Sequence, residues 1–268
     1  MSEIDDFVSS LKINIDAKDL KTHAYQLRKE SGKGCALCDY HGYTINYKGQ
    51  HAICACVKEK LLLDIYRVAN VPNVYIGKTI EDWNTRTDGL GNDLGIQQTT
   101  SEHIYSLLKF YVKHLDNICS GGSPKIHHSN NVVNKLHSIL FEGNIGSGKT
   151  FIASILVQEA IKKNLSSKYF EWSELVQAFT DFDKKDIADN IADDFRNLDF
   201  IAIDGIEYFN YNHPQLPFQL DRISKARLNS GKPIVLFTFG NISQIYGGSG
   251  WTSLIKNCLQ VRLPYAIS

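Results

Sequence analysis

A glycine-rich segment from Gly143 to Thr150 has the residue types and the spacing of a phosphate-binding loop. Its sequence, GNIGSGKT, matches the pattern G-x-x-x-x-G-K-[ST] at every fixed position. Glycines let the backbone turn tightly, so that its N–H groups can point at phosphate oxygens, and a helix that begins there adds a partial positive charge. The candidate nucleotide-binding residues are Gly143, Asn144, Ile145, Gly146, Ser147, Gly148, Lys149 and Thr150.

Two side chains of this loop carry specific chemistry. Lys149 can reach the β- and γ-phosphates of ATP, and the hydroxyl of Thr150 can ligate Mg²⁺. The loop also follows an apolar run over 138–142 and opens a helical pattern over 149–164, the strand–loop–helix context that the motif requires. A glycine-rich turn without a ligand is the alternative, and the match at every fixed position disfavours it. The sequence therefore predicts binding of ATP and Mg²⁺.

Asp204 supplies the second half of such a site, because it ends the apolar run 200–204. A carboxylate in this place holds Mg²⁺ directly or through water. Ordinary buried strands also end in Asp, but a position downstream of a phosphate-binding loop favours the magnesium role. One predicted strand, 168–172, lies between the two motifs along the chain. This order favours the P-loop ATPases in which an extra strand separates the strands of the two motifs, over the kinase and GTPase branch.

The set of residues that hydrolysis would need is incomplete in this sequence. ATPases of this branch place an acid after the magnesium carboxylate to polarise the attacking water, and here that residue is Gly205. Glu207 either takes this role, if the chain bends it inward, or is a solvated turn residue. Asn241, after the apolar run 233–238, either senses the γ-phosphate or caps the next helical segment. The catalytic candidates are Asp204, Glu207 and Asn241.

Four cysteines in two close pairs predict a structural zinc site near the N-terminus. They are Cys35, Cys38, Cys54 and Cys56. Four thiolates can close a tetrahedral Zn²⁺ site, and the segment 43–50 between the pairs has the pattern of a hairpin. The second pair has one intervening residue where two are usual, so His41 or His51 could replace a cysteine as ligand. Four unrelated reduced thiols are the alternative, and an iron–sulfur cluster suits a short hairpin less well.

The pattern of secondary structure changes near residue 138. Upstream, helical periodicity over 57–70 and 101–119 is separated by polar segments, 77–98 and 120–131, that we interpret as loops. Downstream, strands alternate with helices, so we expect an α/β fold with a parallel sheet covered on both faces. The predicted strands are 138–142, 168–172, 200–204, 233–238 and 259–263, and the predicted helices are 149–164, 173–182 and 216–229. The predicted domains are a small N-terminal zinc-binding helical module over 1–70, a linker over 71–100 and an ATP-binding domain over 101–268.

The composition excludes several functional classes. The chain has 268 residues, with 29 Lys and Arg against 29 Asp and Glu, so no global positive field draws it to nucleic acid or to an anionic membrane. No apolar run approaches the roughly 18 residues of a membrane span, and the acidic N-terminus lacks the pattern of a secretory signal. The clustering of four of the six cysteines favours a metal site in a reducing compartment over a disulfide framework. We expect a cytoplasmic protein without membrane contact.

Five segments outside the phosphate-binding loop share a pattern with one known family. They are 35–43, 54–60, 69–72, 78–83 and 227–241. Together they resemble the zinc module, the linker and the sensor-1 segment of bacterial replicative helicase loaders of the DnaC/DnaI type, which are AAA+ ATPases with an IstB-like ATP-binding domain. The cysteine spacing joined to these segments is more specific than the phosphate-binding loop alone.

The resemblance implies an AAA+ ATPase that binds the replicative DNA helicase, of the DnaB type, through its N-terminal part and single-stranded DNA through its ATPase part. In such proteins ATP controls assembly on DNA and release of the helicase, and self-association on nucleotide or DNA is expected. Carried over by position, Lys149 and Thr150 bind ATP and Mg²⁺. Asp204 takes the place of the Walker B acid, and Asn241 takes the place of sensor 1.

Three departures from the family pattern bear on hydrolysis. Gly205 stands where the family has a second acid, and Cys258 stands where it has an arginine finger. The sequence also ends at Ser268, before the stretch that would carry a sensor-2 arginine. The arginines available as displaced fingers are Arg222, Arg227 and Arg262. Because an arginine finger supplies roughly 10³–10⁵ in rate, we expect weak or no hydrolysis.

Two other functions stay open. A transposition-helper ATPase of the IstB type shares this core and binds duplex DNA and a transposase, so a preference for duplex DNA would favour it. A nucleotide-binding adaptor without catalysis would use the loop to hold nucleotide and the zinc module to dock a protein. For DNA contact the sequence offers only scattered lysine pairs, 162–163 and 184–185, which are more often solvated side chains.

Overall fold

The computed structural model describes residues 43–45, 51–84, 95–128, 131–181, 185–207, 215–239 and 248–263. The chain divides into two compact units between Ala69 and Asn70. Within the described ranges, no helix has both the length and the apolar character needed to cross a membrane.

A short hairpin and a helix form the described part of the first unit. Strand β1 (Tyr43–Ile45) pairs antiparallel with β2 (His51–Ile53), and Cys54 then leads into α3 (Ala55–Val68). The hairpin and the helix predicted here are both confirmed. The turn of the hairpin lies outside the described residues.

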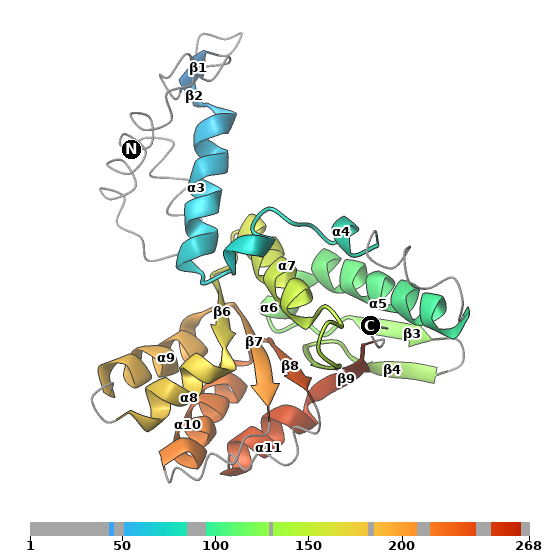
Figure 1. The fold of residues 1–268 in the computed structure, drawn as a ribbon, viewed down its shortest axis with the longest axis vertical. Coiled ribbons are helices and arrows are strands. Elements are labelled where there is room, and N and C mark those ends of the chain that lie inside the picture. Colours follow the sequence, from blue (N-terminus) through green and yellow to red (C-terminus); the bar gives the residue numbers. More distant parts are fainter. Residues whose placement is uncertain are drawn as a thin grey trace. The chain divides into compact units, whose positions relative to one another are not determined.

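A five-stranded sheet, parallel throughout, forms the centre of the second unit (Figure 1). Its strands are β5 (Ser138–Glu142), β6 (Ser167–Glu171), β7 (Phe200–Glu207), β8 (Ile234–Phe239) and β9 (Cys258–Arg262). Their order across the sheet is β6-β7-β8-β5-β9. Strand β8 therefore separates β5, which leads into the glycine-rich loop, from β7, which carries Asp204. The sheet therefore has an extra strand between those of the two motifs, as in the branch that the sequence favours. The strand that lies between the motifs along the chain, β6, is at the edge of the sheet.

Helices cover both faces of this sheet (Figure 1). One face is covered by α8 (Trp172–Thr180), α9 (Lys185–Asn197), α10 (Gln215–Ser230) and α11 (Gly248–Lys256). The other face is covered by α5 (Gly95–Lys113), α6 (Leu115–Cys119) and α7 (Lys149–Lys162). The predicted α/β fold is confirmed.

The central strands β5, β7 and β8 are largely buried on both faces, which explains their nearly continuous apolar sequences. Successive residues of β8 point to opposite faces. Leu236 joins the apolar cluster beneath α8 to α11, where the rings of Trp172 and Trp251 stack with centroids 5.8 Å apart. Phe237 points the other way and stacks on Phe141 of β5 at 5.1 Å. The sheet is thus fixed from both sides and gives the loops at its carboxyl edge a rigid base.

Several elements differ from the sequence-based expectation. The segment 120–131, interpreted as a loop, contains β3 (Lys125–His128), which pairs antiparallel with β4 (Asn131–Lys135). These strands are short and mostly polar, so they lack a strong apolar alternation. The sequence analysis also does not predict α9, which is rich in Asp, or α11, which begins with Gly248-Ser249-Gly250.

Candidate nucleotide-binding site

The glycine-rich loop connects the carboxyl end of β5 to the first turn of α7. Gly146 has φ of 83° and Gly148, the N-cap of α7, has φ of 88°. These left-handed conformations are strained for residues with a Cβ atom, so glycine is required at both positions. The loop closes before a helix N-terminus, where a phosphate would meet backbone N–H groups and the positive end of the helix dipole.

Lys149 lies over its own loop. Its ammonium donates to the backbone oxygens of Gly143 at 2.6 Å and Asn144 at 2.8 Å. It also lies 5.7 Å from the centre of the Phe239 ring, at the end of β8. The positive charge is thus held above the loop that would cradle the phosphates, and rotation of the side chain alone can redirect it to them.

Thr150 and Asp204 meet as the sequence analysis expects. The Thr150 hydroxyl donates to Oδ2 of Asp204 at 2.6 Å, across from α7 to β7. A hydroxyl has one proton and two lone pairs, so this donation leaves the oxygen lone pairs of Thr150 available to a metal ion. The second donor to Oδ2 is the hydroxyl of Tyr169 on β6, at 2.9 Å. The sequence analysis does not identify Tyr169.

Two buried polar atoms at this site have no hydrogen-bond partner among the described residues. One is Oδ1 of Asp204, a residue that is only 5 % exposed. The other is Oγ of Ser147 in the glycine-rich loop. Buried polar atoms in folded proteins are nearly always paired, so these two atoms are suited to bind a polar ligand or a metal ion. Hydroxyl and carboxylate oxygens are the ligands that Mg²⁺ prefers, and Thr150 with Asp204 therefore fits that ion.

A segment assigned by sequence to the linker packs against α7. It contains η1 (Asn73–Tyr75) and α4 (Glu81–Asn84). The buried side chain of Gln158 accepts from the backbone N–H of Gly77 at 2.8 Å and donates to the backbone oxygen of Tyr75 at 2.9 Å. The Gln158 amide thus holds the segment on α7 through both its oxygen and its nitrogen.

The same segment places an aromatic ring against the glycine-rich loop. Trp83, only 4 % exposed, packs so closely on Gly148 that a Cβ atom there would lie 2.4 Å from Cζ3 of the indole. Its ring also lies 6.1 Å from that of Phe151 on α7. Trp83 therefore forms a wall beside the loop. The segment 78–83 contributes to the family resemblance, but the sequence does not reveal this contact.

A bulge explains why glycine stands after Asp204. The pairing of β7 with β8 shifts between Ile203 and Ile206, and Gly205 has φ of 72°. A glutamate at this position would adopt a strained backbone conformation. Glu207, beyond the bulge, lies in strand β7 rather than in a turn. Asn241 lies outside the described residues, so its sensing role stays a prediction.

Replacing Gly205 with alanine is expected to lower the free energy of unfolding by about 1–2 kcal/mol. The added Cβ would meet no atom within 4 Å, so the cost comes from the left-handed backbone conformation alone. Urea denaturation of both proteins measures it. Gly205→Asn should lose less, because asparagine tolerates this conformation. Equal stability of the wild type and the alanine variant would show that the bulge does not require glycine.

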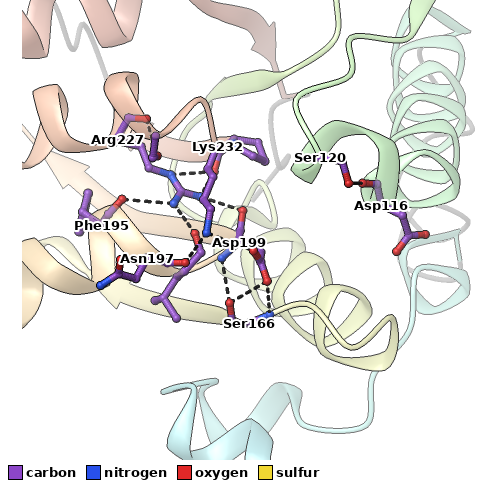
Figure 2. Close-up of polar contacts among 11 residues, drawn as sticks. Asp116, Ser120, Ser166, Phe195, Asn197, Asp199, Arg227 and Lys232 are labelled. Atoms are coloured by element: carbon purple, nitrogen blue, oxygen red, sulfur yellow. Dashed lines mark hydrogen bonds and ion pairs between the residues drawn. The ribbon is translucent and has the colours of Figure 1, made fainter. Parts of the chain in front are cut away.

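The displaced arginine fingers considered above have other partners. Arg227 is fully buried, and all its hydrogen bonds go to backbone oxygens within the domain, so it cannot reach a neighbouring subunit (Figure 2). Arg222 forms an ion pair with Asp189 at 2.8 Å. Arg262 is 88 % exposed and lies 3.7 Å from Glu142. Of the three, Arg262 is the most exposed.

The thiols of the second unit are poor candidates for chemistry. Burial raises the pKa of Cys119 to about 12, and burial does the same for Cys258. The Sγ atom of Cys258 lies 3.3 Å from the backbone oxygen of Leu254. Both side chains are protonated at neutral pH and pack as small apolar groups.

The predicted zinc ligands are only partly within the described residues. Cys54 is the buried N-cap residue of α3, and Cys56 lies in the first turn of that helix. A helix N-terminus stabilises a thiolate, so both positions suit a metal ligand. Cys35, Cys38 and His41 lie outside the described residues, and His51 begins β2. Within the described part of the chain, no group of three or more His, Cys, Asp or Glu could hold a metal ion, so zinc binding stays a prediction.

The lysines considered for DNA contact are ion-paired where they are described. Lys162 lies 2.7 Å from Glu159, and Lys163 lies 2.6 Å from Asp116. The side chains of the other pair, 184–185, are outside the described residues. Lys162 and Lys163 are therefore better described as solvated, ion-paired side chains than as DNA contacts.

Comparison with known proteins yields matches among solved structures. No protein-family model matches the sequence, and no curated protein matches it. DnaA from Aquifex aeolicus bound to AMPPCP is 16% identical, with 72% of this chain and 51% of that chain covered and a TM-score of 0.49. A DnaI structure is 13% identical, with 72% and 90% covered and a TM-score of 0.48. A DnaC helicase loader is 15% identical, with 61% and 90% covered and a TM-score of 0.45. This chain spans about half the length of the DnaA chains that it matches, and its solved structural neighbours include helicase loaders of the DnaI and DnaC type.

Proposed function

We propose that this protein binds ATP with Mg²⁺ and uses the bound nucleotide to control a complex with the replicative DNA helicase. One observation carries the nucleotide half of this proposal. Thr150 and Asp204 meet at 2.6 Å beside the glycine-rich loop, while Oδ1 of Asp204 is buried without a hydrogen-bond partner in the described residues. A phosphate-binding loop joined to such a carboxylate is the arrangement that holds a magnesium nucleotide.

The residues of the site divide the work of binding. The backbone N–H groups of the loop and the ammonium of Lys149 bind the phosphates. Thr150 ligates Mg²⁺, and Asp204 holds the ion directly or through water. Mg²⁺, when bound, neutralises charge on the phosphate oxygens. Trp83 closes one side of the loop against water.

Hydrolysis is expected to be slow. Gly205 supplies no acid beside Asp204, and the bulge at this position favours glycine. Of the arginines considered as fingers, Arg227 is buried among backbone oxygens. Because the missing finger removes a factor of roughly 10³–10⁵ in rate, the protein works mainly as a nucleotide-gated binder.

The helicase half of the proposal is supported by sequence segments. The cysteine pairs and the segments 69–72 and 78–83 resemble those of helicase loaders. Structural zinc at Cys35, Cys38, Cys54 and Cys56, contact with single-stranded DNA, and self-association on nucleotide or DNA belong to the same proposal.

Light scattering of the full chain mixed with its host's DnaB-type helicase tests this function. We expect a complex whose mass changes when ATP and Mg²⁺ are added. Lys149→Ala should remove the nucleotide response, and Lys162→Ala, at the far end of α7, should keep it. No complex under any nucleotide condition would contradict the loader function. Preference for duplex DNA would then favour a transposition helper, and nucleotide binding without DNA binding would favour an adaptor.

A further inference from the structure

Tyr169 occupies a buried position on strand β6, beside the strand that carries Asp204. Tyr169 is 6 % exposed, and its hydroxyl donates a hydrogen bond to Oδ2 of Asp204 at 2.9 Å. Strands β6 and β7 pair in parallel register, with Tyr169 opposite Ala202. The side chain of Tyr169 thus extends along β7 from Ala202 toward Asp204.

The two oxygens of Asp204 have different surroundings. Oδ2 accepts hydrogen bonds from Thr150 and Tyr169, while Oδ1 is buried and has no partner among the described residues. The torsion that exchanges the two oxygens of an aspartate is soft and nearly two-fold. The two donors to Oδ2 therefore fix which of the two oxygens stays unpaired.

Tyr169 is suited to this task because it stays a donor. Its one proton is committed to Oδ2. Thr150 alone is a weaker constraint, because its hydroxyl also takes part in metal binding in the proposed site.

We propose that Tyr169 is a positioning residue that holds Oδ2 of Asp204, so that Oδ1 faces the Mg²⁺ of a bound nucleotide. This inference rests on the proposed nucleotide-binding function. In this role Tyr169 increases the effect of Mg²⁺ on ATP affinity, and it does not bind the phosphates themselves.

The test is the Mg²⁺ dependence of ATP binding by the full-length Tyr169→Phe protein. Calorimetry measures ATP affinity with Mg²⁺ and with EDTA, and the ratio of the two affinities reports the coupling. Loss of one hydrogen bond to a charged group is expected to lower this ratio about tenfold, with the affinity in EDTA unchanged. Tyr169→Met, which fills similar space without a hydroxyl, should show the same loss.

Tyr111→Phe is the matched control. Tyr111 is also buried, and its hydroxyl donates to the backbone oxygen of His137 at 2.8 Å rather than to a residue of the site. This variant should lose stability as Tyr169→Phe does and keep the wild-type ratio. An unchanged ratio in Tyr169→Phe, or an equal loss in both variants, would overturn the role of Tyr169 while leaving the nucleotide site intact. A wild type that binds no ATP would instead overturn the proposed function, and this inference with it.

Discussion

Replacing Lys149 with alanine is expected to weaken ATP binding by about 100-fold. The ammonium donates to the backbone oxygens of Gly143 and Asn144, directly above the loop, and it can turn these two donations to phosphate oxygens. Two charge-assisted hydrogen bonds at roughly 1.5 kcal/mol each give about 3 kcal/mol, and about 1.4 kcal/mol is tenfold in affinity. Calorimetric titration with ATP and Mg²⁺ measures the loss.

Thermal unfolding supplies a second readout for the same variant. ATP at about 100 times its dissociation constant stabilises a folded protein by about 2.7 kcal/mol, so the wild type should melt at a higher temperature with nucleotide. Lys149→Ala should show almost no such shift at the same concentration. Lys162→Ala is the control, because this lysine is on the same helix and pairs with Glu159 far from the loop. Equal shifts in all three proteins would show that Lys149 does not contact the nucleotide.

The sequence predicts the parts of this site that depend on local spacing. The glycine-rich loop is one continuous segment between a strand and a helix, so its fixed positions reveal both its shape and its chemistry. Asp204 is predicted for a similar reason, since the carboxyl ends of parallel strands meet at one edge of the sheet. The parallel sheet is predicted from the alternation of strands and helices along the chain. These predictions need no knowledge of which side chains touch.

The remaining parts of the site depend on contacts between distant segments. Tyr169 is one aromatic residue in a short strand, and its bond to Asp204 exists only once β6 pairs with β7. Trp83 and Gln158 lie far apart in the sequence, and both are committed to the contact between the segment 70–84 and α7. Part of that segment lies in the polar, glycine-containing stretch 77–98, whose pattern indicates a loop. Its packing is decided by tertiary contacts, which periodicity does not record.

Arg227 shows how a buried charge can serve the fold rather than the site (Figure 2). It lies in α10, and its Nε and Nη2 donate to the backbone oxygen of Pro233. Nη1 donates to Phe195 at 3.3 Å and to Leu198 at 2.5 Å, and Nη2 donates to Asp199 at 3.0 Å, all at backbone oxygens. These acceptors lie at the end of α9, before β7, and before β8. Burial lowers the pKa of Arg227 to about 9, which leaves the guanidinium charged at neutral pH.

Replacing Arg227 with methionine is therefore expected to lower the free energy of unfolding by about 3–5 kcal/mol. Methionine fills much of the volume, but it leaves four backbone oxygens buried without this donor, and each unmet group costs roughly 1–3 kcal/mol before relaxation. Domains of this kind are stable by only about 5–15 kcal/mol, so much of the stability should be lost. Urea denaturation followed by circular dichroism measures the change.

Lysine cannot replace the arginine either, because its three donors lack the planar fork that reaches four oxygens. Arg227→Lys should consequently lose nearly as much stability as Arg227→Met. Arg196→Met is the matched control, since Arg196 is exposed on α9 and pairs only with Asp193 at 2.7 Å in the described structure. Exposed pairs contribute about 0–1 kcal/mol, so this variant should unfold near the wild-type midpoint. Loss of less than about 1 kcal/mol in Arg227→Met would mean that water replaces the guanidinium, and that the junction of α9, β7 and β8 does not depend on it.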